Sequence, residues 1–188
     1  MQEGPDPGVV TSTDVILSEV EGSGSSKVTK TQQSSKAILI AFCFCFVVFV
    51  LDRLTKWLFM NEVFCAGDVI PCLLAFTKHH NFGLLGDTSV PIILMYGLNA
   101  LAFAVLVYAM VGHAGKRETG KLFALAVVLG GAIGNLYDRA FYGYVFDWLM
   151  FFNLSIINLA DVWITIGLAA YAWMVFRNEK HVTKEGVV

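Results

Sequence analysis

The chain has 188 residues, of which 56% are hydrophobic and only 15% are charged, and its mean hydropathy is +0.66. Soluble domains carry about 25% charged residues, so the composition excludes an ordinary water-soluble protein and indicates an integral membrane protein. The formal net charge of −2 gives no support for a nucleic-acid partner or for a basic surface role.

The N-terminal segment differs from the rest of the chain. Residues 1–35 are rich in Gly, Ser, Thr and acidic residues and contain no apolar run, which predicts a disordered cytoplasmic tail. No cleavable signal peptide is expected, because the first apolar segment is too long and no small-residue cleavage motif follows it. We interpret that segment as an uncleaved first span.

Four segments are long and apolar enough to cross a bilayer as helices, which needs about 20 residues. They cover residues 37–60, 90–111, 121–138 and 157–177. The expected fold class is therefore an all-α integral membrane protein with a four-transmembrane-helix bundle over residues 36–178, followed by a cytoplasmic tail at 179–188. In the third span, Gly130 and Gly134 form a GxxxG pair, which lets another helix approach closely.

The distribution of basic residues predicts the orientation, because Lys and Arg near span ends favour the cytoplasmic side. Nine of them lie on the side that holds both termini, at Lys27, Lys30, Lys36, Lys116, Arg117, Lys121, Arg177, Lys180 and Lys184. Only four lie on the other side, at Arg53, Lys56, Lys78 and Arg139. With an even number of spans, both termini are expected in the cytoplasm.

Two extracytoplasmic segments connect the spans. Residues 61–89 alternate apolar and aromatic residues, with turn signals at Gly67–Asp68 and Gly86–Asp87, and predict short strands at the membrane interface. His79 and His80 are adjacent and are interpreted as interfacial polar residues rather than metal ligands. Residues 140–156 are too aromatic for a solvated loop, so they are expected in the headgroup region or dipping back into the membrane.

The cysteines fall in two groups. Cys43 and Cys45 lie within the first span, where they are expected to serve packing. Cys65 and Cys72 lie in the first extracytoplasmic loop, where a disulfide and two free thiols fit the sequence equally well. Neither pair has the further ligands of a zinc site.

The charged residues of the spans gather at one end of the predicted bundle. They are Asp52, Arg53 and Lys56 in the first span, Asp138 and Arg139 in the third, and Asp161 in the fourth. Intramembrane ionisable residues are costly and indicate a functional site.

Helical spacing groups several of these residues on common faces. Asp52 and Lys56 are four residues apart with the acid first, the better order for an ion pair. Asn135 precedes Asp138 by three residues, and Asn158 precedes Asp161 by three, so each amide shares a face with a carboxyl. For Asp52–Lys56 and for Asp138 beside Arg139, a purely structural role is as well supported as a functional one.

Asp161 differs, because no basic residue lies within 15 positions of it. Asp147 is expected at about the same depth. Two carboxyls held about 3 Å apart cannot both ionise and share one proton, so that one can activate water while the other protonates a peptide carbonyl. No GxSxG motif, Cys–His arrangement or metal motif competes for this role.

The motifs resemble those of bacterial lipoprotein signal peptidase, the signal peptidase II family, in the same order over residues 37–177. They are DRLTK at 52–56, HNFG at 80–83, GGAIGNLYDR at 130–139, GYVFDW at 143–148 and NLADVWITIG at 158–167. The combination is highly specific, although each motif alone is weak. Residues 1–35 lie outside the resemblance.

The resemblance implies an aspartic endopeptidase without metal or cofactor, active as a monomer in the inner membrane with its site near the extracytoplasmic face. Its substrates are diacylglyceryl-modified prolipoproteins, which it cleaves before the lipidated cysteine, and its other partners are membrane lipids. The family fold adds a small extracytoplasmic β-sheet and a short interfacial helix to the four spans. Asp147 and Asp161 would form the catalytic pair. Substrate-binding positions fall on Asn81, Gly83, Asn135, Arg139 and Asn158, and supporting positions on Asp52, Lys56 and Asp138.

The chain departs from the family pattern at three places. Residues 83–86 read Gly-Leu-Leu-Gly instead of the usual Gly-Ala-Ala-Phe, and Ile157 replaces a Phe. The interval from Asp147 to Asp161 is also a few residues shorter than expected. These departures concern the interfacial element and the pocket rather than the catalytic pair.

The alternative hypothesis is a small proton-coupled membrane transporter, since intramembrane Asp, Asn and Lys also build ion pathways. Against it, the charges gather at one end of the bundle, and no paired set of broken helices is visible. A non-catalytic scaffold is less well supported, because a scaffold gains nothing from unpaired buried carboxyls. A presenilin-type protease would need a Gly-x-Gly-Asp motif, which the chain lacks.

Overall fold

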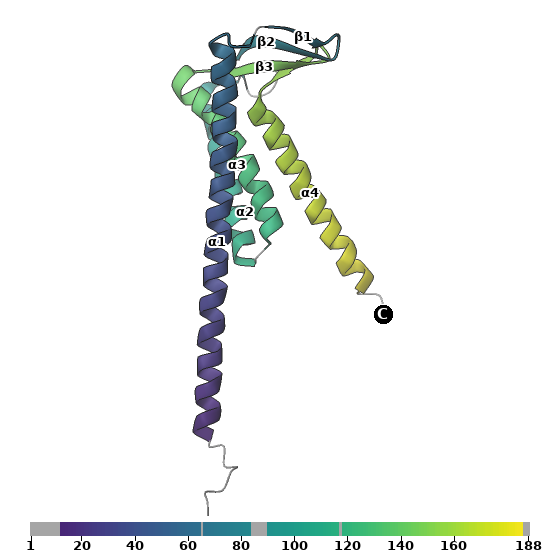
Figure 1. Cartoon of the computed structure of the whole chain (residues 1–188). Coiled ribbons are helices and arrows are strands. Elements are labelled where there is room, and N and C mark those ends of the chain that lie inside the picture. Colours follow the sequence, from purple (N-terminus) through teal and green to yellow (C-terminus); the bar gives the residue numbers. More distant parts are fainter. Residues whose placement is uncertain (1–11, 65, 84–89, 117, 186–188) are drawn as a thin grey trace, which may run out of the picture.

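The computed structural model describes residues 12–64, 66–83, 90–116 and 118–185. Within them the chain forms a bundle of four helices, with a small sheet lying across one end (Figure 1). The elements are α1 (Ser12–Met60), β1 (Gly67–Ile70), β2 (Leu74–Asn81), α2 (Ile92–Lys116), α3 (Thr119–Tyr142), β3 (Val145–Phe151), β4 (Ser155–Ile157) and α4 (Leu159–Glu185).

The predicted spans are confirmed. The helical segments Ser35–Met60, Ile92–Lys116, Thr119–Tyr142 and Leu159–Arg177 are each long and apolar enough to cross a membrane. In the most apolar window of Thr119–Tyr142, 56% of the residues are buried, against 22% or less in the other three spans. Helix α3 is therefore the centre of the bundle, and the other helices present much of their surface to lipid.

Helix α1 begins at Ser12, so residues 12–35 are helical where the sequence predicted a disordered tail. Extending an existing helix adds one hydrogen bond per residue without a new nucleation step, which explains how this polar segment continues the span. The predicted disorder of residues 1–11 and the predicted turn at Gly86–Asp87 concern positions outside the described residues, as does Cys65. Cys72 is free and exposed.

Glycines let α1 and α4 approach α3 closely, as the GxxxG pair predicted. A Cβ at Gly130 would lie 2.6 Å from the carbonyl oxygen of Cys45 on α1. On another face of α3, a Cβ at Gly131 would lie 2.6 Å from the carbonyl oxygen of Ala160 on α4. These contacts bring the polar ends of three helices to one place.

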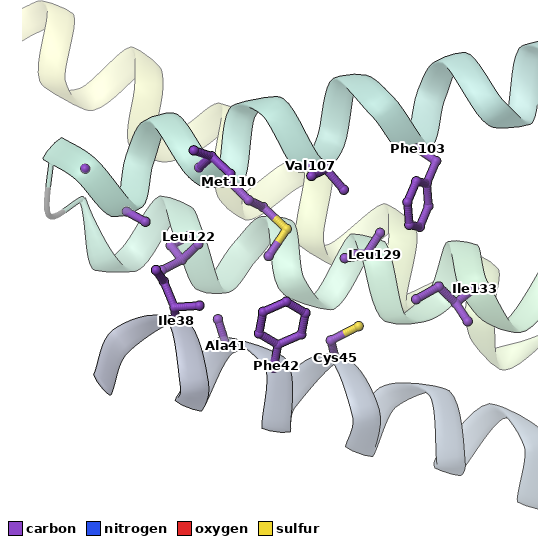
Figure 2. Close-up of a pocket in the computed structure, with 13 residues that line it drawn as sticks. Ile38, Ala41, Phe42, Cys45, Phe103, Val107, Met110, Leu122, Leu129 and Ile133 are labelled. Carbon is purple, nitrogen blue, oxygen red and sulfur yellow. The ribbon is translucent and has the colours of Figure 1, made fainter. Parts of the chain in front are cut away.

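Helix α2 packs less tightly against the bundle. A groove of about 590 Å³ lies between α1, α2 and α3, lined by apolar side chains such as Phe42, Met110 and Leu129 (Figure 2). Cys45 also lines it, which agrees with its predicted packing role. This groove belongs to the apolar part of the bundle and contains none of the predicted site residues.

The sheet is antiparallel with the strand order β1-β2-β3-β4. The strands expected within residues 61–89 are confirmed as β1 and β2, and β2 pairs with β3 from Leu74↔Phe151 to Asn81↔Val145. The short interfacial helix implied by the resemblance is absent from the described residues, because the segment after α3 forms β3 and β4 instead. The short Asp147–Asp161 interval is thus filled by a strand hairpin.

Candidate active site

Asp147 is held in the middle of strand β3. Helix α3 ends at Tyr142 and is capped by Gly143, whose φ of 80° is easily adopted only by glycine. The N–H of Gly143 donates to the carbonyl of Arg139. The chain then turns into β3, where Asp147 is 1% exposed. Asn81 Nδ2 donates to Asp147 Oδ2 at 3.1 Å, and Asn158 Nδ2 donates to Asp147 Oδ1 at 2.6 Å.

Asp161 lies in the first turn of α4, in a reciprocal cap. Asn158 Oδ1 accepts from the Asp161 N–H at 3.1 Å, and Asp161 Oδ2 accepts from the Asn158 N–H at 3.2 Å. This is the arrangement of a capping box, and a helix N-terminus favours a nearby carboxylate. Asn135 Nδ2 donates to the other oxygen of Asp161 at 2.7 Å.

Asn158 connects the two carboxyls. It is fully buried. Its side-chain N–H donates to Asp147, and its backbone N–H donates to Asp161. It also donates to Asn135 Oδ1 at 3.0 Å. The structure therefore brings together the two carboxyls of the predicted pair, with the amides Asn81, Asn135 and Asn158 around them.

The environment of Asp147 favours its protonated form. Burial raises the pKa of Asp147 to about 6, because a charge is poorly solvated there. The hydrogen bonds from Asn81 and Asn158 act in the opposite direction, and the negative charge of Asp161 adds to the rise. This carboxyl can therefore hold a proton at pH values where an exposed aspartate has lost it.

The remaining charges form a compact ion-pair quartet of Asp52, Arg53, Lys56 and Asp138. Lys56 Nζ lies 3.0 Å from Asp52 Oδ2 and 2.7 Å from Asp138 Oδ2. Arg53 Nη2 lies 2.9 Å from Asp52, and its Nη1 lies 2.5 Å from Asp138. The predicted Asp52–Lys56 pair is thus present, whereas Asp138 pairs with these two cations of α1.

Backbone amides join the quartet to the elements that carry the catalytic candidates. Asp138 Oδ2 accepts from the N–H of Phe146 at 3.1 Å, next to Asp147 in β3. Asp52 Oδ1 accepts from the N–H of Ala160 at 3.0 Å, next to Asp161 in α4. The quartet therefore fixes the positions of both elements without touching either candidate carboxyl.

Arg139 holds the loop that follows β2. Its Nη2 donates to the carbonyl of Gly83 at 3.1 Å, and the N–H of Gly83 donates to Asn81 Oδ1 at 2.9 Å. Among the described residues, Nε of Arg139 is buried and has no hydrogen-bond partner. Arg139 thus brings one cationic group with spare hydrogen-bonding capacity to the candidate pair.

The charges of the site balance only with one extra proton. The quartet contains two carboxyls and two cations, while in the part of the chain that the structure describes Asp147 and Asp161 have only Arg139 as a cation outside the quartet near them. One proton shared by the pair brings the total to neutral. Sequence reasoning missed Arg53 as a supporting residue, although its place beside Asp52 within a span was a signal.

Every predicted site residue lies in this region of the structure. The two catalytic positions and the amides Asn81 and Asn135 lie around Asn158, and Gly83 and Arg139 flank this group. The three supporting positions form the quartet together with Arg53. In the part of the chain that the structure describes, no three His, Cys, Asp or Glu side chains come together as metal ligands.

Comparison with known proteins identifies relatives of this arrangement. Residues 44–177 match the family described as Signal peptidase (SPase) II. A lipoprotein signal peptidase of Pseudomonas aeruginosa (strain UCBPP-PA14) is 36% identical over 145 residues, covering 71% of this chain and 86% of the relative. A lipoprotein signal peptidase of Halalkalibacterium halodurans is 33% identical over 155 residues, covering 78% of this chain and 98% of the relative.

Solved structures show the same fold. Two structures of bacterial membrane enzymes align with TM-scores of 0.64 and 0.63, at 21% and 24% sequence identity. The first alignment covers 77% of this chain and 92% of the solved one, and the second covers 73% and 93%.

Proposed function

The chain belongs to the signal peptidase II family, and on that premise we propose that it is an aspartic endopeptidase acting on prolipoproteins. It removes the signal peptide from diacylglyceryl-modified precursors by cleaving before the lipidated cysteine. Asp147 and Asp161 are its catalytic pair. The relatives give no support to the alternative of a proton-coupled transporter.

The observation that carries the aspartic assignment is the double contact of Asn158. One buried residue donates to Asp147 through its side chain and to Asp161 through its backbone. The other carboxyls of the site, Asp52 and Asp138, are engaged by Arg53 and Lys56. The pair is therefore the acidic part of the site that remains available for proton transfer.

The chemistry follows from a pair of carboxyls that shares one proton. The ionised member takes a proton from a water molecule, and the water oxygen attacks the scissile carbonyl. The protonated member gives its proton to the carbonyl oxygen, so a neutral tetrahedral intermediate forms. The carboxyl that took the proton from water then gives it to the departing amide nitrogen, and the C–N bond breaks. As the carbonyl re-forms, one hydroxyl of the intermediate returns its proton to the pair, which again holds one proton.

The neighbouring polar residues position the pair and the peptide. Asn81, Asn135 and Asn158 hold the carboxyl oxygens through the amide donors described above. Gly83 places its backbone against Asn81 and Arg139, and Arg139 has a buried Nε left for a substrate carbonyl. We assign these five residues to substrate binding, and Asp52, Lys56 and Asp138 to support of the site.

The membrane setting fits the same reaction. The four candidate spans make the chain a multi-pass membrane protein, and we place its sheet and catalytic pair at the extracytoplasmic face of the inner membrane. A lipidated cysteine is anchored at the bilayer surface, so a site at the level of the span ends meets the adjoining peptide bond. The protein works as a monomer in this proposal, since both carboxyls come from one chain.

Side-by-side cleavage assays test the assignment. Asp147→Asn and Asp161→Asn keep the shape of each side chain but cannot share a proton, so each should abolish conversion of a diacylglyceryl prolipoprotein while the protein still inserts. Asp68→Asn, the same change on an exposed carboxyl of β1, is the matched control and should cleave normally. Chelators should have no effect.

Asp138→Asn separates chemistry from support. It should mainly lower the amount of inserted protein, because it weakens the quartet. Loss of turnover at normal protein level would mean that Asp138 is the reacting carboxyl. Activity retained in either variant of the pair would contradict the proposal.

A further inference from the structure

Two tight turns lie side by side at one end of the sheet. The β1–β2 turn and the β3–β4 turn meet where Leu74 pairs with Phe151, and the N–H of Phe152 bonds to the carbonyl of Leu73 at 2.9 Å. This end is opposite the one where Asn81 pairs with Val145. We call residues 69–73 and 152–154 the hairpin tip.

The hairpin tip exposes large apolar side chains. Leu154 is 89% exposed and Phe152 is 61% exposed. The end of β1 adds Val69 and Ile70 at 48% and 47%, and the turn after it adds Leu73 at 38%. No charged residue occurs in residues 69–77 or 148–160. Phe152 adopts a φ of 52°, which a bulky residue rarely does. A charge-free apolar cluster of this kind marks an interaction surface.

The position of the hairpin tip relates it to the membrane. Strand β4 ends at Ile157 and the span of α4 begins at Leu159, so the hairpin leaves the bundle where α4 enters the bilayer. The strands run across the end of the bundle, and the ends of β1, β2 and β3 project beyond the start of α4 (Figure 1). The α4 span that follows the hairpin also exposes apolar side chains, among them Ile166 and Leu168.

We propose that the hairpin tip is a lipid-contacting element that inserts its apolar side chains between the headgroups of the bilayer. Apolar groups leave water for the acyl boundary, as in proteins that lie on a membrane interface. Because the tip has no charged side chain, its insertion does not require the desolvation of a charge. Because β3 also carries Asp147, the inserted tip fixes the depth of Asp147 in the membrane, while the α4 span fixes the depth of Asp161.

Another copy of this chain is a different possible occupant of the same surface. The hairpin is joined directly to the start of the α4 span, which favours lipid, and no second copy is needed to complete the catalytic pair. The two occupants predict different results in one experiment. That experiment does not depend on peptide cleavage, so it also stands apart from the proposed function.

The test uses the unmodified protein in nanodiscs of phosphatidylethanolamine and phosphatidylglycerol that contain a phospholipid with a photoreactive diazirine on its acyl chain. After illumination, peptide mass spectrometry should find label on residues 150–157 and 69–74 at a level comparable with the lipid-facing part of α2. The peptide containing Lys78, an exposed charge on β2, should carry at least fivefold less label.

A pair of variants gives the matched comparison. Leu154→Asp should cut labelling of the hairpin tip severalfold, because a charge resists insertion, while labelling of α2 stays unchanged and reports an intact bundle. Val63→Asp introduces the same charge at a residue that is 56% exposed but lies outside the hairpin tip, between α1 and β1, and it should leave tip labelling unchanged.

Two results would overturn the proposal. One is a hairpin tip that carries no more label than the Lys78 peptide. The other is tip labelling that Leu154→Asp leaves unchanged. An unlabelled tip accompanied by disulfide-linked dimers through Cys72, which is free and exposed, would assign the surface to a second copy.

Discussion

At the scale of single residues, the state of Asp147 reflects burial opposed by hydrogen bonds. Because burial raises its pKa to about 6, the folded protein keeps a proton that the unfolded chain releases near pH 4. The contribution of this group to stability therefore falls as the pH rises from about 4 to about 6. The proton whose loss lowers stability at higher pH is the same proton that the proposed chemistry uses.

The pH dependence of cleavage tests this balance. A pair that must hold one proton loses activity as the pH rises, so kcat/KM should have an alkaline limb whose apparent pKa belongs to the pair. Asn81→Ala removes a donor that favours the ionised form of Asp147, which should raise that pKa and move the limb to higher pH. Asp68→Asn should leave the limb in place, and an unmoved limb in Asn81→Ala would contradict the assigned role.

Asn158 has two separable tasks, capping α4 and orienting the pair. Asn158→Ala removes both, so it should lower stability by about 1 kcal/mol through the lost cap and lower kcat by at least tenfold. Asn158→Ser keeps a capping oxygen but cannot reach Asp147, so it should lower kcat with little change in thermal stability. Thermal unfolding in detergent and single-turnover cleavage separate the two effects. Equal stability losses in the two variants would show that capping is unimportant here.

At the scale of elements, the ion-pair quartet connects α1 and α3 and, through backbone amides, β3 and α4. Lys56 is 1% exposed and contacts Asp52 and Asp138. Removing one partner from a buried ion pair typically costs about 3–5 kcal/mol, because the other charge remains unpaired. Among the contacts between these elements, loss of the quartet should therefore lower the stability of the protein most.

Lys56→Met tests the quartet. It should destabilise the protein by about 3–5 kcal/mol, measured as a lower unfolding midpoint in detergent. Adding Asp138→Asn to Lys56→Met restores charge balance with Arg53 and Asp52, so the double variant should be more stable than Lys56→Met alone. Lys78→Met removes an exposed pair with Glu62 and should lower the unfolding midpoint far less, because surface ion pairs contribute little to stability. A double variant less stable than the single one would refute charge balance as the cause.

Gly134 tests the close approach of α1 to α3. An added Cβ would lie 2.5 Å from Asp52 Oδ2, and Asp52 is held by Arg53 and Lys56. Gly134→Ala should therefore cost about 1–3 kcal/mol and disturb the quartet. Gly97→Ala on α2 meets no atom within 4 Å and should be neutral or stabilise the helix by up to about 1 kcal/mol. Similar unfolding midpoints for the two variants would contradict this account.

These elements also show what the sequence could predict. Apolar runs identify spans directly, and the i, i+4 spacing identified the Asp52–Lys56 pair. The pairing of Asp138 with Arg53 joins residues 85 positions apart, which depends on the register of α1 against α3. Residues 145–151 form a strand because β2 offers a pairing edge, and strand preference depends on such context. The local sequence pattern therefore predicts neither the Arg53–Asp138 pair nor the strand at residues 145–151.

At the scale of the whole molecule, polar groups occupy both ends of the bundle. Opposite the catalytic pair, His113 near the end of α2 lies 2.5 Å from Glu118 Oε2 and 3.0 Å from the Tyr171 hydroxyl on α4. Lys121 Nζ donates to the other oxygen of Glu118 at 2.7 Å. This second cluster joins α2, α3 and α4 at the far end, so the apolar middle of the bundle lies between two polar layers.

The charge distribution predicts the orientation of this bundle. With nine basic residues on the side of the termini and four on the side of the sheet, the positive-inside rule predicts that the termini lie in the cytoplasm. The opposite orientation would put the catalytic pair on the cytoplasmic side, away from substrates anchored at the extracytoplasmic surface. The charge distribution and the proposed reaction therefore require the same orientation.

Reporter fusions test that orientation in bacterial cells. Green fluorescent protein joined after Val188 should fluoresce, because it matures in the cytoplasm, and alkaline phosphatase at the same place should be inactive. Alkaline phosphatase fused after Gly83, on the side of the sheet, should be active, whereas a fusion after Gly115, in the last turn of α2, should not. Active phosphatase after Val188 or Gly115 would reverse the predicted orientation. It would also separate the catalytic pair from its proposed substrates, since the pair lies at the end of the bundle away from the termini.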